Sequence, residues 1–194
     1  MTPPTNETSE RILDAAEALF MARGYDGVKL RDIAEAVGMR HASLYYYVPK
    51  GKEQLFVTVL RRSMARHEAG MARFIAEAGA GIQAQAYAVS DWLVAQPPLD
   101  LVRMFEADLR AVDPAVAREL AHLIFASLTR PLVAALQEAQ QAGTVAVEDA
   151  QMATMALLTL IQSVHQIPLE SLPNGRKALG RKLVDMLLYG WLAR

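Results

Sequence analysis

The chain has 194 residues, a formal net charge of −1 and no cysteine. The length suits one medium domain, or a small domain joined to a larger one. The lack of cysteine excludes disulfides, thiolate metal sites and cysteine nucleophiles, and it is compatible with a cytoplasmic location. Hydrophobic residues make up 53% of the chain, so we expect a large core. The polar N-terminus lacks a signal-peptide profile, and no run of about 18 uncharged apolar residues predicts a membrane span.

Helical patterns follow one another along the whole chain, and alternating strand patterns are absent. Asp113 followed by Pro114 is typical of a helix start, whereas Pro131 is expected to kink or split the helix that contains it. The expected helices cover residues 8–23, two short segments within 30–47, and then 51–78, 82–95, 99–111, 114–142, 148–166 and 176–193. The sequence therefore predicts an all-α protein of about nine helices.

Two short amphipathic helices are predicted between residues 30 and 47. Ile33 and Val37 give the first helix an apolar edge, and Leu44 and Val48 do the same for the second. The turn between them contains Gly38, which can adopt positive φ and end the first helix. The other side chains at the second helix are polar or aromatic: Arg40, His41, Ser43, Tyr45, Tyr46 and Tyr47. A helix–turn–helix of this size fits the major groove of DNA.

Basic residues outnumber acidic ones just after this segment. From Arg40 to His67 the acidic residues are represented by Glu53 alone, against the basic residues Arg40, Lys50, Lys52, Arg61, Arg62 and Arg66. Most such clusters are solvated helix faces. Because this one adjoins the tyrosine-rich helix, we favour contact with DNA phosphates.

The ordered motifs of residues 9–60 resemble the DNA-binding domain of the TetR family of bacterial transcriptional repressors. The matching segments are Ile12-Leu13-Asp14-Ala15-Ala16 with Leu19-Phe20, Gly24-Tyr25, Asp32-Ile33-Ala34 with Val37-Gly38, Leu44-Tyr45, and Lys52-Glu53 with Leu55. The resemblance implies a helix-turn-helix DNA-binding domain in residues 1–50, with a C-terminal helical ligand-binding and dimerisation domain in residues 51–194. It implies a homodimeric repressor that a small-molecule effector releases from a palindromic operator.

A competing interpretation is a helical small-molecule carrier or interaction protein that retains an unused DNA-binding head. Under the repressor interpretation, nine residues are expected to contact double-stranded DNA: Lys29, Arg40, His41, Ala42, Ser43, Tyr45, Tyr47, Lys50 and Lys52. The start of the second helix would meet base edges, and the lysines would meet phosphates. Lys29 and Arg40 stand where the family often has a capping Ser or Thr, so neither helix is expected to have a side-chain cap. For Tyr46 we favour packing against the first helix.

The last two predicted helices are too apolar for the surface of a monomer. They could form a central core or a dimer interface, and the resemblance favours the interface. Its predicted residues are Met152, Met155, Leu183, Leu187 and Trp191. The resemblance also implies an effector pocket, for an apolar or aromatic effector, within residues 82–170. Candidates, each of which could also be plain core, are Tyr87, Trp92, Arg103, Met104, Phe105, His122, Phe125, Met155, Gln162 and His165.

Nothing in the sequence predicts an enzyme. The four histidines show no paired metal-ligand spacing, and no nucleophile elbow, phosphate loop or dinucleotide fingerprint is present. Glu106 and Asp108 lie on a predicted helix and are expected to be solvated carboxylates. We therefore expect no catalytic residues, no metal and no cofactor.

Overall fold

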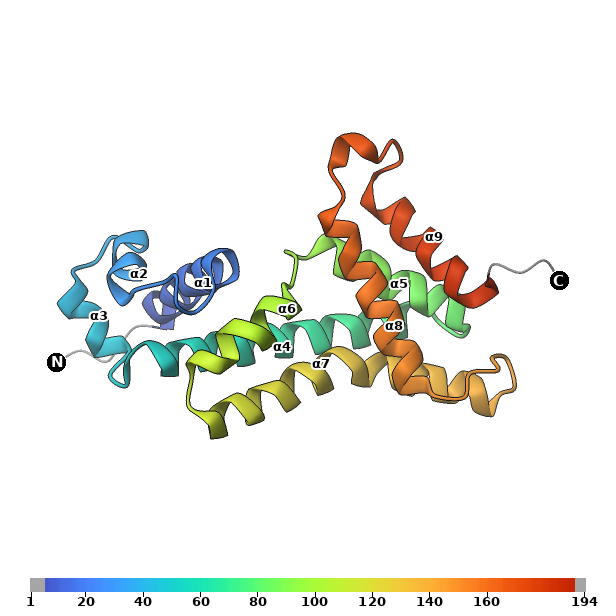
Figure 1. The fold of residues 1–194 in the computed structure, drawn as a ribbon, viewed down its shortest axis with the longest axis horizontal. Coiled ribbons are helices and arrows are strands. Elements are labelled where there is room, and N and C mark those ends of the chain that lie inside the picture. The colour runs from blue at the N-terminus through green and yellow to red at the C-terminus, as the bar shows by residue number, and fades with distance from the viewer. Residues whose placement is uncertain (1–5, 191–194) are drawn as a thin grey trace. The chain divides into compact units, whose positions relative to one another are not determined.

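The computed structural model describes residues 6–190, and over that range it contains helices and no strands. It confirms the predicted all-α class, with nine α-helices in the described part of the chain (Figure 1). These are α1 (Asn6–Arg23), α2 (Leu30–Ala36), α3 (His41–Tyr47), α4 (Gly51–Glu77), α5 (Ile82–Ala95), α6 (Leu101–Arg103), α7 (Pro114–Gln141), α8 (Ala150–Ser163) and α9 (Gly175–Tyr189). A π-helical turn, η1 (Met104–Asp108), and three 3-10 turns, η2 (Leu109–Ala111), η3 (Val164–Gln166) and η4 (Leu169–Ser171), complete the set.

The described residues form two compact units. The head unit comprises residues 6–65 and 100–124, and the body unit comprises residues 66–99 and 125–190. Two of the three boundaries fall inside long helices, α4 and α7, which therefore contribute to both units, and the third lies between α5 and α6. The domain boundary proposed after residue 50 stays a prediction. The head unit, in contrast, extends to residue 65 and includes a segment from the middle of the chain.

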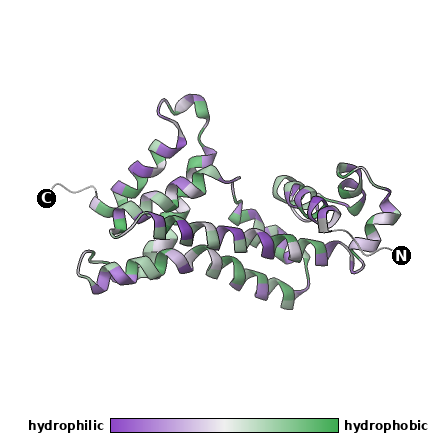
Figure 2. Ribbon diagram, turned by 180° about the vertical axis from the view of Figure 1, so that it is seen from behind, coloured by the Kyte–Doolittle hydropathy of each residue, from purple (hydrophilic) through white to green (hydrophobic). Residues whose placement is uncertain are grey.

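An aromatic cluster forms the centre of the head unit. Phe20 and Phe56 are fully buried and meet edge to face, with their ring centroids 5.2 Å apart. Tyr25 packs against Phe56 in the same way at 5.1 Å. Apolar and polar residues alternate around α1 and α4, as expected for helices with one buried side (Figure 2). This cluster packs the C-terminal end of α1 against the start of α4.

The core of the body unit lies where α5, α8 and α9 pack on one another. Leu93 of α5, Ile161 of α8 and Val184 of α9 are each at most 1% exposed. Close approach of α5 and α9 depends on a small residue, since a Cβ at Gly180 would lie 2.4 Å from the Ser90 hydroxyl oxygen. The apolar patterns of the last two helices thus serve, at least in part, as core.

The structure corrects three predicted elements. Residues 99–111 are not one α-helix but the succession α6, η1 and η2, in which Asp100 caps α6 by accepting from the Arg103 amide at 2.9 Å. Of the two outcomes expected at Pro131, the split is wrong, because α7 runs through this residue from Pro114 to Gln141, and the kink stays a prediction. The helix predicted to end at Gln166 stops as an α-helix at Ser163 and continues as a 3-10 turn.

Helix α7 is also long and apolar enough to cross a membrane by length and composition, with 44% of that apolar window buried within the described structure. Buried helices of globular proteins have the same properties. Leu120, Ile124, Leu128 and Leu132 on α7 are core residues. Packing therefore accounts for part of the apolar character of α7.

Candidate nucleic-acid interface

Buried side chains set α3 against α2. Ile33 and Ala34 of α2 and Leu44 of α3 are at most 2% exposed, and α2 contacts both α1 and α3. The turn after α2 is closed by two backbone hydrogen bonds, from Gly38 N to Glu35 O at 3.0 Å and from Met39 N to Ala34 O at 2.9 Å. This is a Schellman ending, which requires the positive φ of +73° found at Gly38.

The starts of α2 and α3 lack side-chain caps, as predicted. Neither Lys29 nor Arg40 forms a cap hydrogen bond with its side chain. A different contact is present at the start of α2, where the backbone amide of Lys29 donates to the Asp32 carboxylate at 2.9 Å. That hydrogen bond is the main reason why the pKa of Asp32 is lowered. The side chains of Lys29 and Arg40 thus make no capping contact within their own helices.

One side of α3 is left exposed by this packing. His41, Ala42, Ser43, Tyr45 and Tyr46 are all exposed, whereas Leu44 is buried. Tyr45 is 47% exposed and its ring meets that of His41 edge to face, with centroids 5.1 Å apart. Tyr46 is 38% exposed and its ring meets that of Tyr47 edge to face, with centroids 5.5 Å apart, and its packing against the first helix stays a prediction. The α3 surface therefore presents hydrogen-bonding and aromatic groups together.

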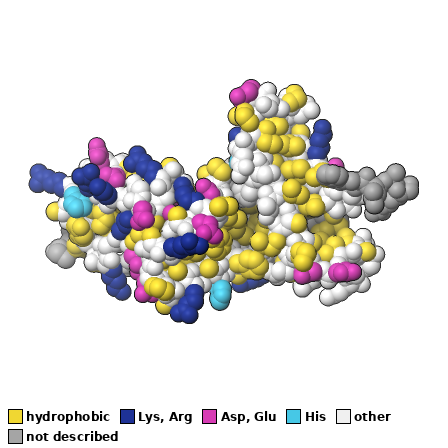
Figure 3. All heavy atoms as spheres, viewed as in Figure 1, with side chains coloured by type: hydrophobic (Ala, Val, Ile, Leu, Met, Phe, Trp, Pro, Cys, Tyr) yellow, Lys and Arg dark blue, Asp and Glu magenta, His cyan; other side chains and the backbone are white. Residues whose placement is uncertain are grey.

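Basic side chains are numerous over the α1–α3 part of the head unit (Figure 3). Lys29, Arg40 and Lys50 are exposed, and they stand in the chain just before α2, just before α3 and shortly after α3, respectively. The basic cluster expected from the sequence is less extensive than predicted, since two of its arginines form ion pairs inside the head unit. Arg61 pairs with Glu119, and Arg62 with Asp14. The positive surface is thus centred on the two short helices and the loops beside them.

Lys52 has an internal role that the sequence did not indicate. Its ammonium group donates to the Tyr25 carbonyl oxygen at 3.1 Å and lies 3.9 Å from the centroid of the Tyr25 ring. This contact ties the first turn of α4 to the segment after α1. Burial is the main cause of the raised pKa of Tyr25. Contact of Lys52 with a phosphate stays a prediction. A phosphate would have to share the Lys52 ammonium group with the Tyr25 carbonyl oxygen and ring.

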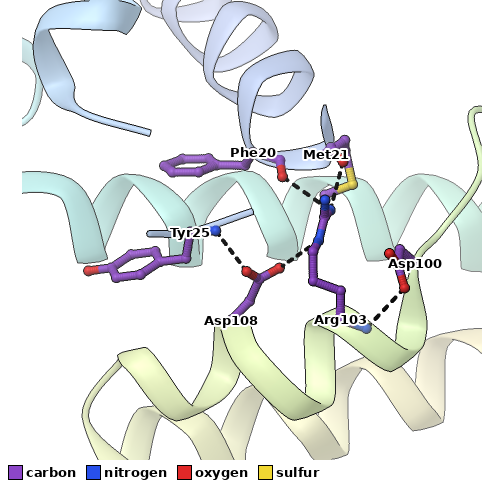
Figure 4. Close-up of polar contacts among 6 residues, drawn as sticks. All are labelled: Phe20, Met21, Tyr25, Asp100, Arg103 and Asp108. Carbon is purple, nitrogen blue, oxygen red and sulfur yellow. Dashed lines mark hydrogen bonds and ion pairs between the residues drawn. The ribbon is translucent and has the colours of Figure 1, made fainter. Parts of the chain in front are cut away.

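A polar clamp joins the middle of the chain to the end of α1 (Figure 4). Arg103 donates to the carbonyl oxygens of Met21 and Phe20, at 2.6 and 3.3 Å. Asp108 is 5% exposed, accepts from the Tyr25 amide at 2.7 Å and lies 3.5 Å from the Arg103 guanidinium. The expectation that Asp108 is solvated was wrong. Since a guanidinium binds well to the last carbonyls of a helix, Arg103 here acts as a C-terminal cap of α1.

The predicted effector residues are not brought into one pocket. Arg103, Phe105 and His122 belong to the head unit, where Phe105 and His122 are exposed. In the body unit, Phe125 and Met155 are exposed, while His165 is half-buried near the Leu93 carbonyl oxygen at 3.4 Å. Gln162 is half-buried on α8. Met104 is 1% exposed in the head unit. Tyr87 and Trp92 line an open groove beside α5. Each assignment to an effector stays a prediction.

A separate apolar cavity of about 110 Å³ lies within the body unit, between α5, α7, α8 and α9. Its walls are aliphatic and include Ile82, Leu136, Leu157, Val184 and Leu188. None of the predicted effector residues lines it. A cavity of this size and lining can take a short apolar group.

The predicted dimer residues divide by exposure. Met152, at 69%, Leu187, at 41%, and Met155, at 37%, are exposed apolar side chains on α8 and α9. Leu183 is half-buried, and Trp191 lies outside the described residues. Figure 3 shows apolar side chains gathered over the α8 and α9 region. Such a patch is unusual on a monomer, so a protein interface there stays our prediction.

Among residues 6–190, no group of three or more His, Cys, Asp or Glu side chains could hold a metal ion. What the described site offers is a short helix set on a buried turn, exposed polar side chains at the start of that helix, and cations beside it. This combination defines a helix-turn-helix DNA-binding regulator.

Comparison with known proteins identifies the family. Residues 12–59 match the bacterial regulatory proteins of the TetR family, and residues 80–175 match the C-terminal domain of AefR-like transcriptional repressors. The chain belongs to the TetR family of transcriptional regulators, a family of DNA-binding proteins.

Individual relatives are similar over different extents. The HTH-type transcriptional regulator LmrA of Bacillus subtilis (strain 168) is 45% identical over 51 residues, which are 26% of this chain and 27% of LmrA. The match therefore spans about a quarter of that relative. The fatty acid degradation regulator FadR of Bacillus halodurans superposes with a TM-score of 0.76 at 19% identity, over 99% of this chain and 100% of FadR. AibR, in complex with isovaleryl coenzyme A and operator DNA, superposes with a TM-score of 0.74 at 18% identity, over 93% of this chain and 97% of AibR.

Proposed function

We propose that this protein is a cytoplasmic transcriptional repressor that binds a palindromic operator as a homodimer and is released by a small-molecule effector. The observation that carries the proposal is the exposed α3 surface. His41, Ser43 and Tyr45 are exposed on a helix whose opposite side is buried through Leu44. A helix held in this way can enter a major groove and bring its first turn to the base edges.

The groups around α3 divide into two roles. His41, Ala42 and Ser43, at the start of the helix, would read base edges, and Arg40 would pair with a guanine. The exposed Lys29 and Lys50, with Tyr45 and Tyr47, would contact phosphates and set the register of α3 in the groove. Contacts to phosphate should contribute affinity for any DNA, whereas the first turn of α3 should determine which sequence is preferred.

The effector is proposed to be apolar, at least in part, because the cavity between α5, α7, α8 and α9 is aliphatic. AibR was crystallised with isovaleryl coenzyme A, whose acyl chain is short and branched. A group of that size suits a cavity of about 110 Å³. Since α4 and α7 each contribute residues to both units, either helix could transmit a change in the body to the head. We propose α4 as the route.

The test is binding to the DNA upstream of the protein's own coding region, measured by fluorescence anisotropy against scrambled DNA of equal length. We expect specific binding, which His41→Ala should make less selective and Tyr45→Ala should weaken. Arg110→Ala is the control, since Arg110 is an exposed head-unit cation paired with Glu106. Equal affinity for both DNAs in the unmodified protein would instead favour the carrier or interaction protein.

Effector release is tested next with compounds that displace the DNA. Operator and effector must weaken each other's binding by the same factor, because the two equilibria are linked. A releasing compound is therefore titrated into the protein with and without operator. Identical affinity in the two titrations would show that the compound binds without regulating, and the release mechanism would be wrong while the DNA-binding function stands.

A further inference from the structure

An open groove of about 450 Å³ lies in the body unit, bordered by α4, α5 and α9. Its volume is within the range of small-molecule sites, and it is distinct from the aliphatic cavity described above. Three of its lining residues are aromatic, Phe74, Tyr87 and Trp92, and two are basic, Lys177 and Arg181. Three alanines of α5, Ala84, Ala88 and Ala95, also line the groove. Small side chains there leave room for a ligand between an aromatic wall and a cationic wall.

The aromatic wall is formed by Phe74 of α4 and Trp92 of α5. Their ring centroids are 5.3 Å apart with the planes tilted by 37°, and both side chains are partly exposed. The Trp92 indole rests on α4 at Gly70, where a Cβ would come within 2.2 Å of the ring. The indole is therefore held in one position by its neighbour. A pair of fixed, partly exposed rings can stack on a planar ligand.

The opposite wall carries positive charge. Arg181 binds Asp91 through two hydrogen bonds, of 3.2 and 2.7 Å, and its guanidinium lies 5.3 Å from the centroid of the Tyr87 ring. The Asp91 carboxylate is thus already matched by a cation. Lys177 lies one helical turn before Arg181 on α9, is exposed, and adds a second cation to the groove. The lining therefore favours an anionic group over a neutral or cationic one.

We propose that this groove binds a small planar aromatic acid. The ring of the ligand would stack on Phe74 and Trp92, and its carboxylate would lie at Lys177 and the edge of Arg181. Aromatic stacking and a charge-assisted hydrogen bond are the two recognition elements, and each acts on a different part of the ligand. The site is a binding property of the body unit, and it does not depend on operator binding or release.

Isothermal titration calorimetry with 2-naphthoate tests the proposal on the full-length protein. The neutral 2-naphthamide tests the need for charge, and cyclohexanecarboxylate tests the need for a planar ring. We expect 2-naphthoate to bind at one site per chain, and each analogue to bind at least about fivefold more weakly. Equal affinity of 2-naphthoate and 2-naphthamide, or no binding of 2-naphthoate, would overturn the proposal.

Lys177→Ala locates the site without disturbing the core, because Lys177 is exposed. It should weaken 2-naphthoate binding about fivefold, and Lys177→Arg should restore the affinity. Lys182→Ala is the matched control, since Lys182 is also exposed on α9 but does not line the groove. An equal effect of the two alanine variants would place the ligand elsewhere and contradict the proposal.

Discussion

The Asp108 carboxylate accepts a hydrogen bond from the Tyr25 backbone amide at 2.7 Å, across 83 residues of sequence. Asp108 ends a π-helical turn, and Tyr25 follows the end of α1, so the contact joins two parts of the head unit that are remote in the chain. Arg103 strengthens the junction by pairing with Asp108 and by capping α1. The orientation of α1 is therefore fixed partly by residues outside the DNA-binding segment.

Asp108→Ala should lower the free energy of unfolding by about 1–3 kcal/mol, because it leaves the buried Tyr25 amide without an acceptor. Asp108→Asn should lose less, since its side-chain oxygen can still accept that hydrogen bond. Urea denaturation followed by circular dichroism measures both. Glu106→Ala is the control, because the exposed Glu106–Arg110 pair is expected to contribute little. Equal effects of Asp108→Ala and Glu106→Ala would show that the clamp does not stabilise the fold.

Gly24 and Gly38 provide a matched pair of substitutions. Both have positive φ, +72° and +73°, but a Cβ at Gly24 would lie 2.8 Å from an Asp108 carboxylate oxygen, whereas a Cβ at Gly38 would have no neighbour within 4 Å. Gly38→Ala should therefore lower stability only by the backbone term of about 1–2 kcal/mol, and Gly24→Ala should lower it further. The midpoints of urea unfolding compare the two. A larger loss at Gly38 would contradict the proposed crowding at the clamp.

Local signals explain why much of this fold could be predicted from the sequence. Gly24, Gly38 and Pro114 act within a few residues of themselves, and the helices end or begin at or next to them as expected. The apolar edges of α2 and α3 likewise became buried contacts. The TetR resemblance rested on such short-range patterns, and the family match confirms it.

Long-range contacts account for what the sequence did not predict. Asp108 was expected to be solvated because carboxylates on helix faces usually are, but its hydrogen bond with the Tyr25 amide, 83 residues away in the chain, holds it in the interior. Lys52 matched a family position, yet nothing near it in sequence indicated its contact with Tyr25. For the effector, aromatic and methionine side chains could not be sorted into core and pocket, because both settings favour the same residue types.

Lys50 is predicted to contribute to DNA binding mainly through charge. Lys50→Ala should weaken binding to operator and to scrambled DNA to a similar degree, and the slope of log affinity against log salt should become shallower by about 0.9 for each Lys50, or about 1.8 for the proposed homodimer. Lys50 is exposed in the loop before α4, so its substitution should leave the fold unchanged. Anisotropy titrations at several salt concentrations measure the slope. An unchanged slope would remove Lys50 from the interface.

Met152→Glu should disrupt the proposed dimer. Met152 is 69% exposed on α8, so the substitution leaves the folded chain intact but places a carboxylate in an apolar contact between subunits. Leu187→Glu on α9 should act in the same direction. Light scattering and analytical ultracentrifugation report the mass. Val102→Glu is the control, because Val102 is an equally open apolar residue of the head unit, 75% exposed. If both glutamate variants in α8 and α9 remain dimeric, the interface lies elsewhere.

His165 should make the stability of the protein depend on pH. Burial is the main cause of the lowered pKa of His165, and nearby Arg176 lowers it further, while the hydrogen bond with the Leu93 carbonyl opposes the shift. The unfolded chain therefore binds a proton at a higher pH than the folded protein does. The contribution of His165 to the stability of the fold is fully present above the ordinary histidine pKa of 6.5. It is lost as the pH falls through the lower pKa that His165 has in the folded protein.

The free energy of unfolding should consequently decrease when the pH is lowered from about 7.5 to about 5.5, and His165→Gln should flatten that decrease. Glutamine suits the comparison, because its amide can still donate to the Leu93 carbonyl oxygen but does not titrate in this range. Urea unfolding at a series of pH values gives the free energies for both proteins. The His165 contribution is the difference between the two curves, which should widen toward acid. Parallel curves would mean that His165 is protonated as readily in the folded protein as in the unfolded chain.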